Sequence, residues 1–370
     1  MENPFIFGEP AKGEKFIDRK RELERLKNYI INARNVIIYS PRRFGKTSLV
    51  LKVLEELRGE VISIFIDCYS VTSEKDLASR LTKKVLQHYK GKEIWYAVKK
   101  LFQNITPKIT IETTPEVQIE ISYEGVENWE EALDLPQKLA LDKGKRVVVV
   151  FDEFQELAKF DNLLKLLRSK FQHHDRVSYI FIGSKRHLME WIFKSKESPF
   201  YNFGAHITLK EIPKEEFKIY IRDAFKRGSI EIEEHVVDRI LSLTRCHPYY
   251  TQRLCFELWY VGVLKKVVDE KDVERILSEL ISDLEDSYLL IWESLTPNQR
   301  KVLLAVAKGE EDLFSGEFLR KYDFKSPASV QSALRKLVEK EIVTKIGETY
   351  KVSDIFMEYW LKKRFLEDSF

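Results

Sequence analysis

Short apolar runs alternate with amphipathic stretches over the first two hundred or so residues of the chain. A short strand with apolar residues on both faces is buried on both sides, as in the middle of a parallel sheet. Such runs predict strands at 36–39, 61–67, 147–151, 178–184 and 205–209. Helical patterns lie between them, at 46–57, 74–89, 94–102, 129–141 and 186–193. The alternation predicts an α/β fold, with a parallel sheet and helices on both of its faces.

Two segments inside this pattern alternate strictly between apolar and polar residues. They cover 108–113 and 117–123, with a turn around Thr114 and Pro115. Strict alternation is typical of strands that expose one face. We therefore expect an antiparallel hairpin at about 108–123, inserted into the parallel pattern.

After Pro213 the strand pattern stops, and helical patterns follow one another. They cover 215–227, 234–244, 249–264 and 269–289. This change from strand patterns to helical patterns predicts two successive domains: a sheet-containing core over 1–212 and a helical lid domain over 213–290.

The rest of the chain, 291–370, predicts three helices followed by a short hairpin. Ser326 is placed to cap the third helix, and Pro327 to be its first residue. The hairpin strands are expected at 342–346 and 350–352. Three helices and a hairpin are the outline of a winged helix-turn-helix domain.

The most informative segment is the loop between the first strand and the helix that follows it. Such a loop turns backbone N–H groups toward the oxygens of a di- or triphosphate, and the helix adds its positive dipole end. Lys46 would contact the β- and γ-phosphates, and the Thr47 hydroxyl would bind Mg²⁺. The pattern normally begins with glycine, and a serine fits there if its φ is negative. The candidate nucleotide-binding residues are Ser40, Pro41, Arg42, Arg43, Phe44, Gly45, Lys46, Thr47 and Ser48.

Two carboxylates, Asp152 and Glu153, end the buried strand at 147–151. Open α/β sheets bind their ligands at this end of their strands. Asp152 would hold Mg²⁺ directly or through water, and Glu153 would orient and deprotonate the attacking water. An acidic pair alone could be a solvated strand end, but the phosphate-type loop upstream makes that coincidence improbable. The two motifs together predict an NTP-binding domain, with Lys46 and Glu153 as catalytic residues.

Composition sets looser bounds on function. The net charge is only +3, so composition does not by itself indicate nucleic acid. Neither the three cysteines nor the seven histidines show metal-ligand spacing, so we expect packed thiols and solvated histidines in a reducing cytoplasm. The sequence has no run of about twenty apolar residues and no secretory signal at its start. We expect a cytoplasmic protein without a membrane partner.

Taken together, these residues resemble the archaeal ATPase family, within the STAND and AAA+-related P-loop ATPases. The resemblance extends from about Phe5 to Phe365. Its motifs are Phe16-Ile17-Asp18-Arg19, Pro41-Arg42-Arg43-Phe44-Gly45-Lys46-Thr47-Ser48, Asp152-Glu153-Phe154-Gln155-Glu156-Leu157, Gly183-Ser184 and His247-Pro248-Tyr249-Tyr250. The resemblance implies ATP and ADP as the nucleotides, with Mg²⁺.

The resemblance also implies further site residues. Ser184 matches the polar sensor that touches the γ-phosphate or the attacking water, although it could equally cap the following helix. Pro248 would pack near the adenine, with His247 beside the phosphates. Arg245 and Cys246 stand where the family usually has small residues.

The segment ahead of the first helix adds three more candidates for nucleotide binding. Phe16 and Ile17 could pack against a purine base, or the helix that follows, to about Ile31, could simply cover the sheet edge. Arg19 belongs to the same motif, and Asp18 is the expected helix N-cap.

Two functions fit these residues. The first is an ATPase that uses the lid and the winged helix as a nucleotide-dependent switch. The alternative is a nucleotide-regulated DNA-binding or protein-interaction regulator with little intrinsic hydrolysis. Residues 292–370 contain fourteen Lys and Arg against thirteen Asp and Glu, so duplex DNA and a protein partner stay equally open. Arg42, Arg43 and Arg186 are candidate cations for the γ-phosphate, and we expect slow unstimulated turnover. The oligomeric state is not predicted.

Overall fold

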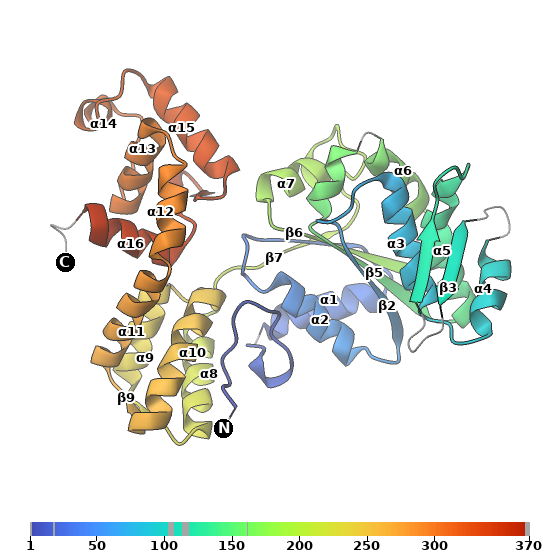
Figure 1. Ribbon diagram of the computed structural model, residues 1–370, viewed down its shortest axis with the longest axis horizontal. Helices are drawn as coiled ribbons and strands as arrows, with labels where there is room; N and C mark the ends of the chain where they lie inside the picture. The colour runs from blue at the N-terminus through green and yellow to red at the C-terminus, as the bar shows by residue number, and fades with distance from the viewer. Residues whose placement is uncertain (1, 18, 103–106, 113–117, 161, 367–370) are drawn as a thin grey trace. The chain divides into compact units, whose positions relative to one another are not determined.

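The computed structural model describes residues 2–17, 19–102, 107–112, 118–160 and 162–366. The chain forms two compact units, one of Phe7–Ile212 and one of Met1–Ile6 with Pro213–Phe370. The first six residues thus group with the second unit. Figure 1 labels the helices and strands of both units.

A five-stranded parallel sheet forms the centre of the first unit, in the order β2-β5-β6-β1-β7. The strands are β1 (Val36–Tyr39), β2 (Val61–Asp67), β5 (Arg146–Asp152), β6 (Val177–Gly183) and β7 (Ala205–Thr208). Because all five run the same way, the loop after β1 and the acidic pair after β5 emerge at the same edge of the sheet. The predicted parallel α/β fold is confirmed.

Both faces of this sheet are buried, as the continuous apolar runs predicted. Successive residues of β5 alternate between two cores, so that Val147 and Val149 pack on one face and Val148 and Val150 on the other. Helices α1 (Lys20–Ile31) and α2 (Lys46–Glu56) cover the second face. The first face is covered mainly by α3 (Glu74–Leu86), α5 (Leu135–Lys143), α6 (Leu163–Phe171) and α7 (Arg186–Lys194), and α4 (Glu93–Leu101) extends this layer.

Two helical predictions in this unit need correction. The segment 129–141 is not one helix, because Trp129–Asp134 is a 3₁₀ helix and α5 begins only at Leu135. Pro136 has no N–H to donate to a preceding carbonyl, so it is tolerated only in the first turn of an α-helix. The α-helix therefore begins next to Pro136, at Leu135, and does not extend back to Trp129. Helix α6 was not predicted, although Leu163, Leu164, Leu167 and Phe171 form its buried face. Further 3₁₀ turns lie at Gly13–Lys15 and Phe154–Lys159.

The predicted antiparallel hairpin is confirmed. Its strands are β3 (Lys108–Glu112) and β4 (Gln118–Ser122), which form a separate two-stranded sheet with Ile109 opposite Ile121. Both isoleucines pack against the core of the unit. The expected turn at Thr114 and Pro115 lies outside the described residues.

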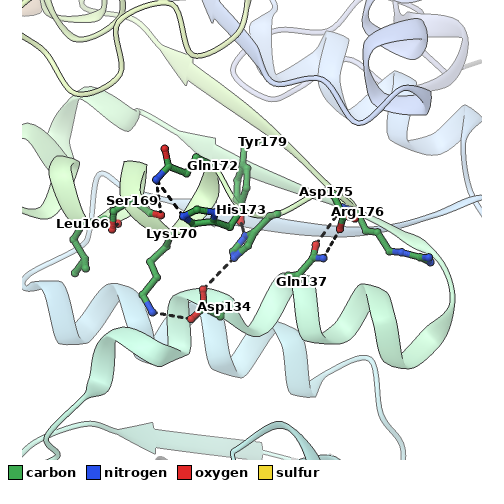
Figure 2. A network of polar contacts seen from close by, with 11 residues as sticks. Asp134, Gln137, Leu166, Ser169, Lys170, Gln172, His173, Asp175, Arg176 and Tyr179 are labelled. Atoms are coloured by element: carbon green, nitrogen blue, oxygen red, sulfur yellow. Dashed lines mark hydrogen bonds and ion pairs between the residues drawn. The ribbon is translucent and has the colours of Figure 1, made fainter.

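A partly buried polar network lies where β6 begins, at the edge opposite the acidic pair (Figure 2). The His174 ring bonds the Tyr179 hydroxyl at 2.6 Å and Asp134 Oδ1 at 3.1 Å, and Lys170 bonds Asp134 Oδ2 at 2.8 Å. The His174 side chain is only 4% exposed, so the expectation of solvated histidines is wrong here. The two ring nitrogens instead bond the buried Tyr179 and the half-buried Asp134, which lie 5 and 40 residues away in the sequence.

The second unit begins with helices α8 (Lys214–Arg227), α9 (Glu234–Thr244), α10 (Pro248–Lys265), α11 (Glu270–Asp283) and α12 (Glu285–Glu293). The single helix expected over 269–289 is therefore two helices, which meet at Leu284. Strands also do not stop after Pro213, because β8 (Glu231–Ile232) pairs in parallel with β9 (Val267–Val268). Segments of two residues are too short to show a period.

The end of the chain has the predicted winged-helix order: α13 (Pro297–Lys308), α14 (Gly316–Lys321), α15 (Pro327–Glu339), β10 (Val343–Ile346) and β11 (Thr349–Val352). Helix α16 (Ile355–Phe365) follows and was not predicted. Ser326 occupies the N-cap position of α15, but its hydroxyl bonds Ser329 Oγ instead of the helix backbone. No helix in the described ranges is both long and apolar enough to cross a membrane.

Candidate nucleotide site

The loop after β1 has the backbone of a phosphate-binding loop. Arg43 and Gly45 have φ values of 66° and 82°, and Gly45 is the N-cap of α2. No atom lies within 4 Å of a Cβ built at Gly45, so the left-handed φ is what favours glycine there. Ser40 is not among the described residues with positive φ, so the serine enters the turn without strain.

Lys46 lies across this loop. Its ammonium donates to the carbonyls of Ser40 and Pro41, at 2.8 and 2.9 Å, and the residue is 7% exposed. The Ser40 hydroxyl is buried and finds no hydrogen-bond partner among the described residues. The loop thus holds a buried cation and an unsatisfied hydroxyl next to the start of a helix, a setting suited to an anion.

The two sequence motifs meet at Thr47 and Asp152. The Thr47 hydroxyl donates to Asp152 Oδ2 at 3.0 Å, although 105 residues separate them. Burial raises the pKa of Asp152, and the nearby charge of Glu153 acts in the same direction. A hydroxyl and a carboxylate are hard oxygen donors of the kind that Mg²⁺ prefers, and one or two protein ligands are usual when phosphates supply the rest. No three His, Cys, Asp or Glu side chains of the described residues gather into a metal site of their own.

Glu153 is held by two side chains. Ser184 Oγ donates to its Oε2 at 2.8 Å, and Gln155 Nε2 donates to the same oxygen at 2.5 Å. Ser184 thus reaches Glu153 from the end of β6, and the N-cap position of α7 is held by Lys185. Glu153 itself has φ of 51°, an uncommon left-handed conformation for a residue with a side chain.

Gln155 is the residue that sequence reasoning missed, although it lies within the Asp-Glu-Phe-Gln-Glu motif. It is 3% exposed and packs under Gly183. A Cβ at Gly183 would lie 2.6 Å from Gln155 Oε1 and 2.4 Å from the Met189 side chain, so only glycine fits. The residues next to Gln155 in the sequence do not reveal this contact, because Gly183 lies 28 positions further along the chain.

The segment ahead of α1 supports the loop from outside. Arg19 donates to the carbonyls of Phe44 and Lys210, at 3.1 and 2.9 Å, and lies 4.0 Å from Glu22. Ile17 is buried, and Phe16 packs against the core that α1 and α2 share. Helix α1 has Arg19 at its N-cap position, and the expected cap, Asp18, lies outside the described residues.

Comparison with known proteins assigns the family. Residues 16–254 match the model of an ATPase domain found predominantly in Archaea, and residues 286–363 match that of a probable winged helix domain. The chain belongs to this archaeal ATPase family. An uncharacterized protein of Methanocaldococcus jannaschii, MJECL04, is 26% identical over 363 residues, which are 95% of this chain and 67% of that protein.

Solved structures share the fold of this archaeal ATPase. The Walker-type ATPase PABY2304 of Pyrococcus abyssi gives a TM-score of 0.70 at 18% identity, over 97% of this chain and 99% of that one. The ORC2 protein of Aeropyrum pernix, in ADPNP and ADP complexes, gives 0.57 at 14% identity over 95% of each chain. The ORC1 protein of Aeropyrum pernix, solved in complex with DNA, gives 0.51 at 15% identity, over 94% of this chain and 93% of that one.

The second unit of this archaeal ATPase contains the His-Pro motif. His247 is the N-cap of α10, and its Nδ1 accepts a hydrogen bond from Tyr249 N at 3.2 Å. Arg245 and Cys246 both have left-handed φ, of 52° and 53°, where small residues were expected. The cation candidates Arg42 and Arg43 are exposed, and Arg186 lies 3.2 Å from Glu190 on its own helix.

Proposed function

We propose that this chain binds ATP or ADP with Mg²⁺ at the loop of residues 40–48 and hydrolyses ATP. The observation that carries the proposal is the 3.0 Å hydrogen bond between Thr47 and Asp152. It brings the hydroxyl at the start of α2 to the carboxylate at the end of β5, as a Mg²⁺–nucleotide site requires. The family membership supports the same conclusion.

The residues of the loop and its surroundings would have different roles in nucleotide binding. Lys46 leaves the Ser40 and Pro41 carbonyls and donates to the β- and γ-phosphates, while the Ser40 hydroxyl gains an acceptor. Thr47 and Asp152 would hold Mg²⁺, which when bound neutralises charge that develops on the phosphates. Arg19, through Phe44, keeps the loop backbone in place rather than touching the nucleotide. Phe16 and Ile17 would line the base side.

Glu153 acts as the general base. The side chains of Ser184 and Gln155 both donate to Oε2, and a carboxylate oxygen that accepts no such bond can accept from water. Oε1 is therefore the oxygen that takes the proton of the attacking water. Ser184 and Gln155 fix the plane of the carboxylate. By the family resemblance, Ser184 would also contact the γ-phosphate or the attacking water.

The lid and the winged helix would respond to the nucleotide. By the family resemblance, Pro248 and His247 are the nucleotide-responsive residues of the second unit. Arg245, two residues before His247, donates to Glu358 of α16, and Tyr359 of α16 donates to the Leu243 carbonyl at 3.1 Å. A movement of the His-Pro segment would therefore be passed to the winged helix within one unit.

A second candidate function is DNA binding through α15. The fold is shared with a protein that was solved in complex with DNA, which favours this candidate. However, Glu339 lies 2.7 Å from Lys336 and 3.9 Å from Arg335 on the exposed face of α15. The acid reduces the positive charge that a duplex would need. Duplex DNA and a protein partner therefore both stay candidates for the winged helix.

A thermal-shift titration with MgATP, MgADP and MgGTP tests nucleotide binding directly. We expect stabilisation by both adenine nucleotides, because binding to the folded state alone raises its stability. Phosphate release, followed with and without duplex DNA, tests the second candidate. If no nucleotide shifts the melting temperature, the proposed site is wrong.

A further inference from the structure

Helix α4 (Glu93–Leu101) presents two aromatic side chains to the solvent. Its inner residues Ile94, Ala97 and Leu101 are buried in the core of the first unit. On its outer side, Trp95 is 56% exposed and Tyr96 is 63% exposed. Large aromatic side chains are normally buried to a greater extent, so an adjacent exposed pair indicates a binding surface.

Lysines surround this aromatic pair. Lys92 and Lys99 are exposed, and each lies three or four residues from an aromatic, which places them beside the rings on the helix surface. Lys100 Nζ lies 5.8 Å from the centre of the Tyr96 ring. Lys90, just before the helix, is also exposed. Exposed lysines therefore lie on the same stretch of chain as the two aromatic rings, and one of them is close to the Tyr96 ring.

Two acids near this surface, Asp142 and Glu93, each have a basic partner among the described residues. Asp142 of α5 accepts from Lys100 and from the Tyr89 hydroxyl, and Glu93 lies 3.9 Å from Lys143. These pairs neutralise one another, so Lys90, Lys92 and Lys99 leave the surface with excess positive charge. An anionic partner is the one that this charge distribution suits.

We propose that the outer face of α4 binds single-stranded nucleic acid. Exposed aromatic rings stack with unpaired bases, and neighbouring lysines neutralise the phosphates that connect those bases. A duplex would not fit in this way, because its bases are already stacked on each other. An anionic membrane fits less well, because the exposed face of α4 has two aromatics among lysines and lacks a continuous apolar stripe.

This surface is separate from both sites of the proposed function. It shares no residue with the loop at 40–48, and it belongs to the first unit, whereas the winged helix belongs to the second. Figure 1 shows α4 beside α5 and β3, at an end of the first unit. Binding at α4 can therefore be tested without nucleotide, and its failure would not bear on the ATP site.

Fluorescence anisotropy with the full chain tests the proposal. The probes are labelled fifteen-nucleotide strands of dT and of rU, and a duplex of the same length. The double variant Trp95→Ala with Tyr96→Ala should bind both single strands at least about tenfold more weakly than wild type. Tyr260→Ala, which removes a 52% exposed aromatic of α10, is the matched control and should bind as wild type does.

A charge variant gives an independent readout. Lys92→Glu with Lys99→Glu should weaken binding and lower the slope of log affinity against log salt by about 0.7 per lost phosphate contact. Lys271→Glu, at an exposed position of α11, should leave that slope unchanged. All of these side chains are exposed, so the melting temperature should stay within about 2 °C of wild type.

Three results would overturn the proposal. The first is that the full chain binds neither single strand, and the second is that it binds them equally well with and without the aromatic pair. Alternatively, vesicles with anionic phospholipid capture the chain through Trp95 and Tyr96 while the oligonucleotides do not. Loss of binding to both strands, confined to the α4 variants, supports it.

Discussion

The guanidinium of Arg245 donates to both carboxylate oxygens of Glu358, at 2.8 and 2.7 Å. The arginine occupies a left-handed position at the end of α9, where a glycine would be free of strain. The carboxylate is on α16, is 9% exposed and also accepts from Lys362. The pair therefore joins the helical part of the second unit to its winged helix, at the cost of a strained backbone.

Two replacements of Arg245 separate the effect of backbone strain on stability from the effect of the ion pair with Glu358. Arg245→Ala should lower the free energy of unfolding by about 1 to 3 kcal/mol, because Glu358 loses its bidentate partner. Arg245→Gly removes the same side chain but relieves the left-handed strain, so it should be about 1 kcal/mol more stable than Arg245→Ala. Urea unfolding measures both. Equal stability of the two variants would show that the backbone is not strained.

The same pair makes stability depend on pH. Burial alone would raise the pKa of Glu358, but hydrogen bonds from Arg245 and Lys362 outweigh it and hold that pKa below the usual 4.5. A lowered folded-state pKa gives stability that is present above pH 4.5 and is lost as the pH falls through the folded value. The melting temperature of wild type should therefore exceed that of Glu358→Gln at pH 7, with the difference shrinking below pH 4.5. A difference that grows in acid would contradict the assignment.

Gln155 is predicted to position the general base without touching the nucleotide. Gln155→Ala removes one of the two donors to Glu153, so kcat should fall about tenfold while the affinity for MgATP stays the same. Single-turnover hydrolysis and nucleotide titration separate the two effects. A variant that hydrolyses faster than wild type would mean that Gln155 restrains Glu153 instead.

The fit of Gly183 against Gln155 and Met189 gives a stability test. Gly183→Ala should lower the free energy of unfolding by about 1 to 3 kcal/mol, because the added methyl overlaps two buried side chains. Gly316→Ala is the control, since its nearest neighbour there is an arginine side-chain nitrogen at 3.7 Å. If both variants are equally stable, the packing around Gly183 is looser than described.

Much of the fold could be predicted because its signals are local. The runs around Val148 and Ile180 are apolar on both faces, and the alternation around Ile109 and Ile121 specifies a hairpin. The β8–β9 pair could not be predicted, because strands of two residues are too short to show an alternation of apolar and polar residues. The break between α11 and α12 at Leu284 could not be predicted either, because it depends on how the helices pack. Nor does the pattern of apolar residues explain why His174 is buried, since its partner Asp134 is 40 residues away.

The candidate site divides in the same way. Lys46, Thr47, Asp152 and Glu153 lie in motifs whose chemistry can be inferred from residue type and spacing. The role of Gln155 could not be inferred, because only the fold brings its amide onto Glu153. The nucleotide-binding roles of all these residues stay predictions until nucleotide binding is measured.

The most direct test of the central claim compares Glu153→Gln with wild type in MgATP binding and phosphate release. The substitution keeps the size of the side chain and removes its basicity. We predict that Glu153→Gln binds MgATP with unchanged affinity and releases phosphate at least about a hundredfold more slowly, whereas the control Lys46→Ala loses tight binding altogether. Phosphate release by Glu153→Gln at the wild-type rate would contradict the account of this chain as an ATPase with Glu153 as its base.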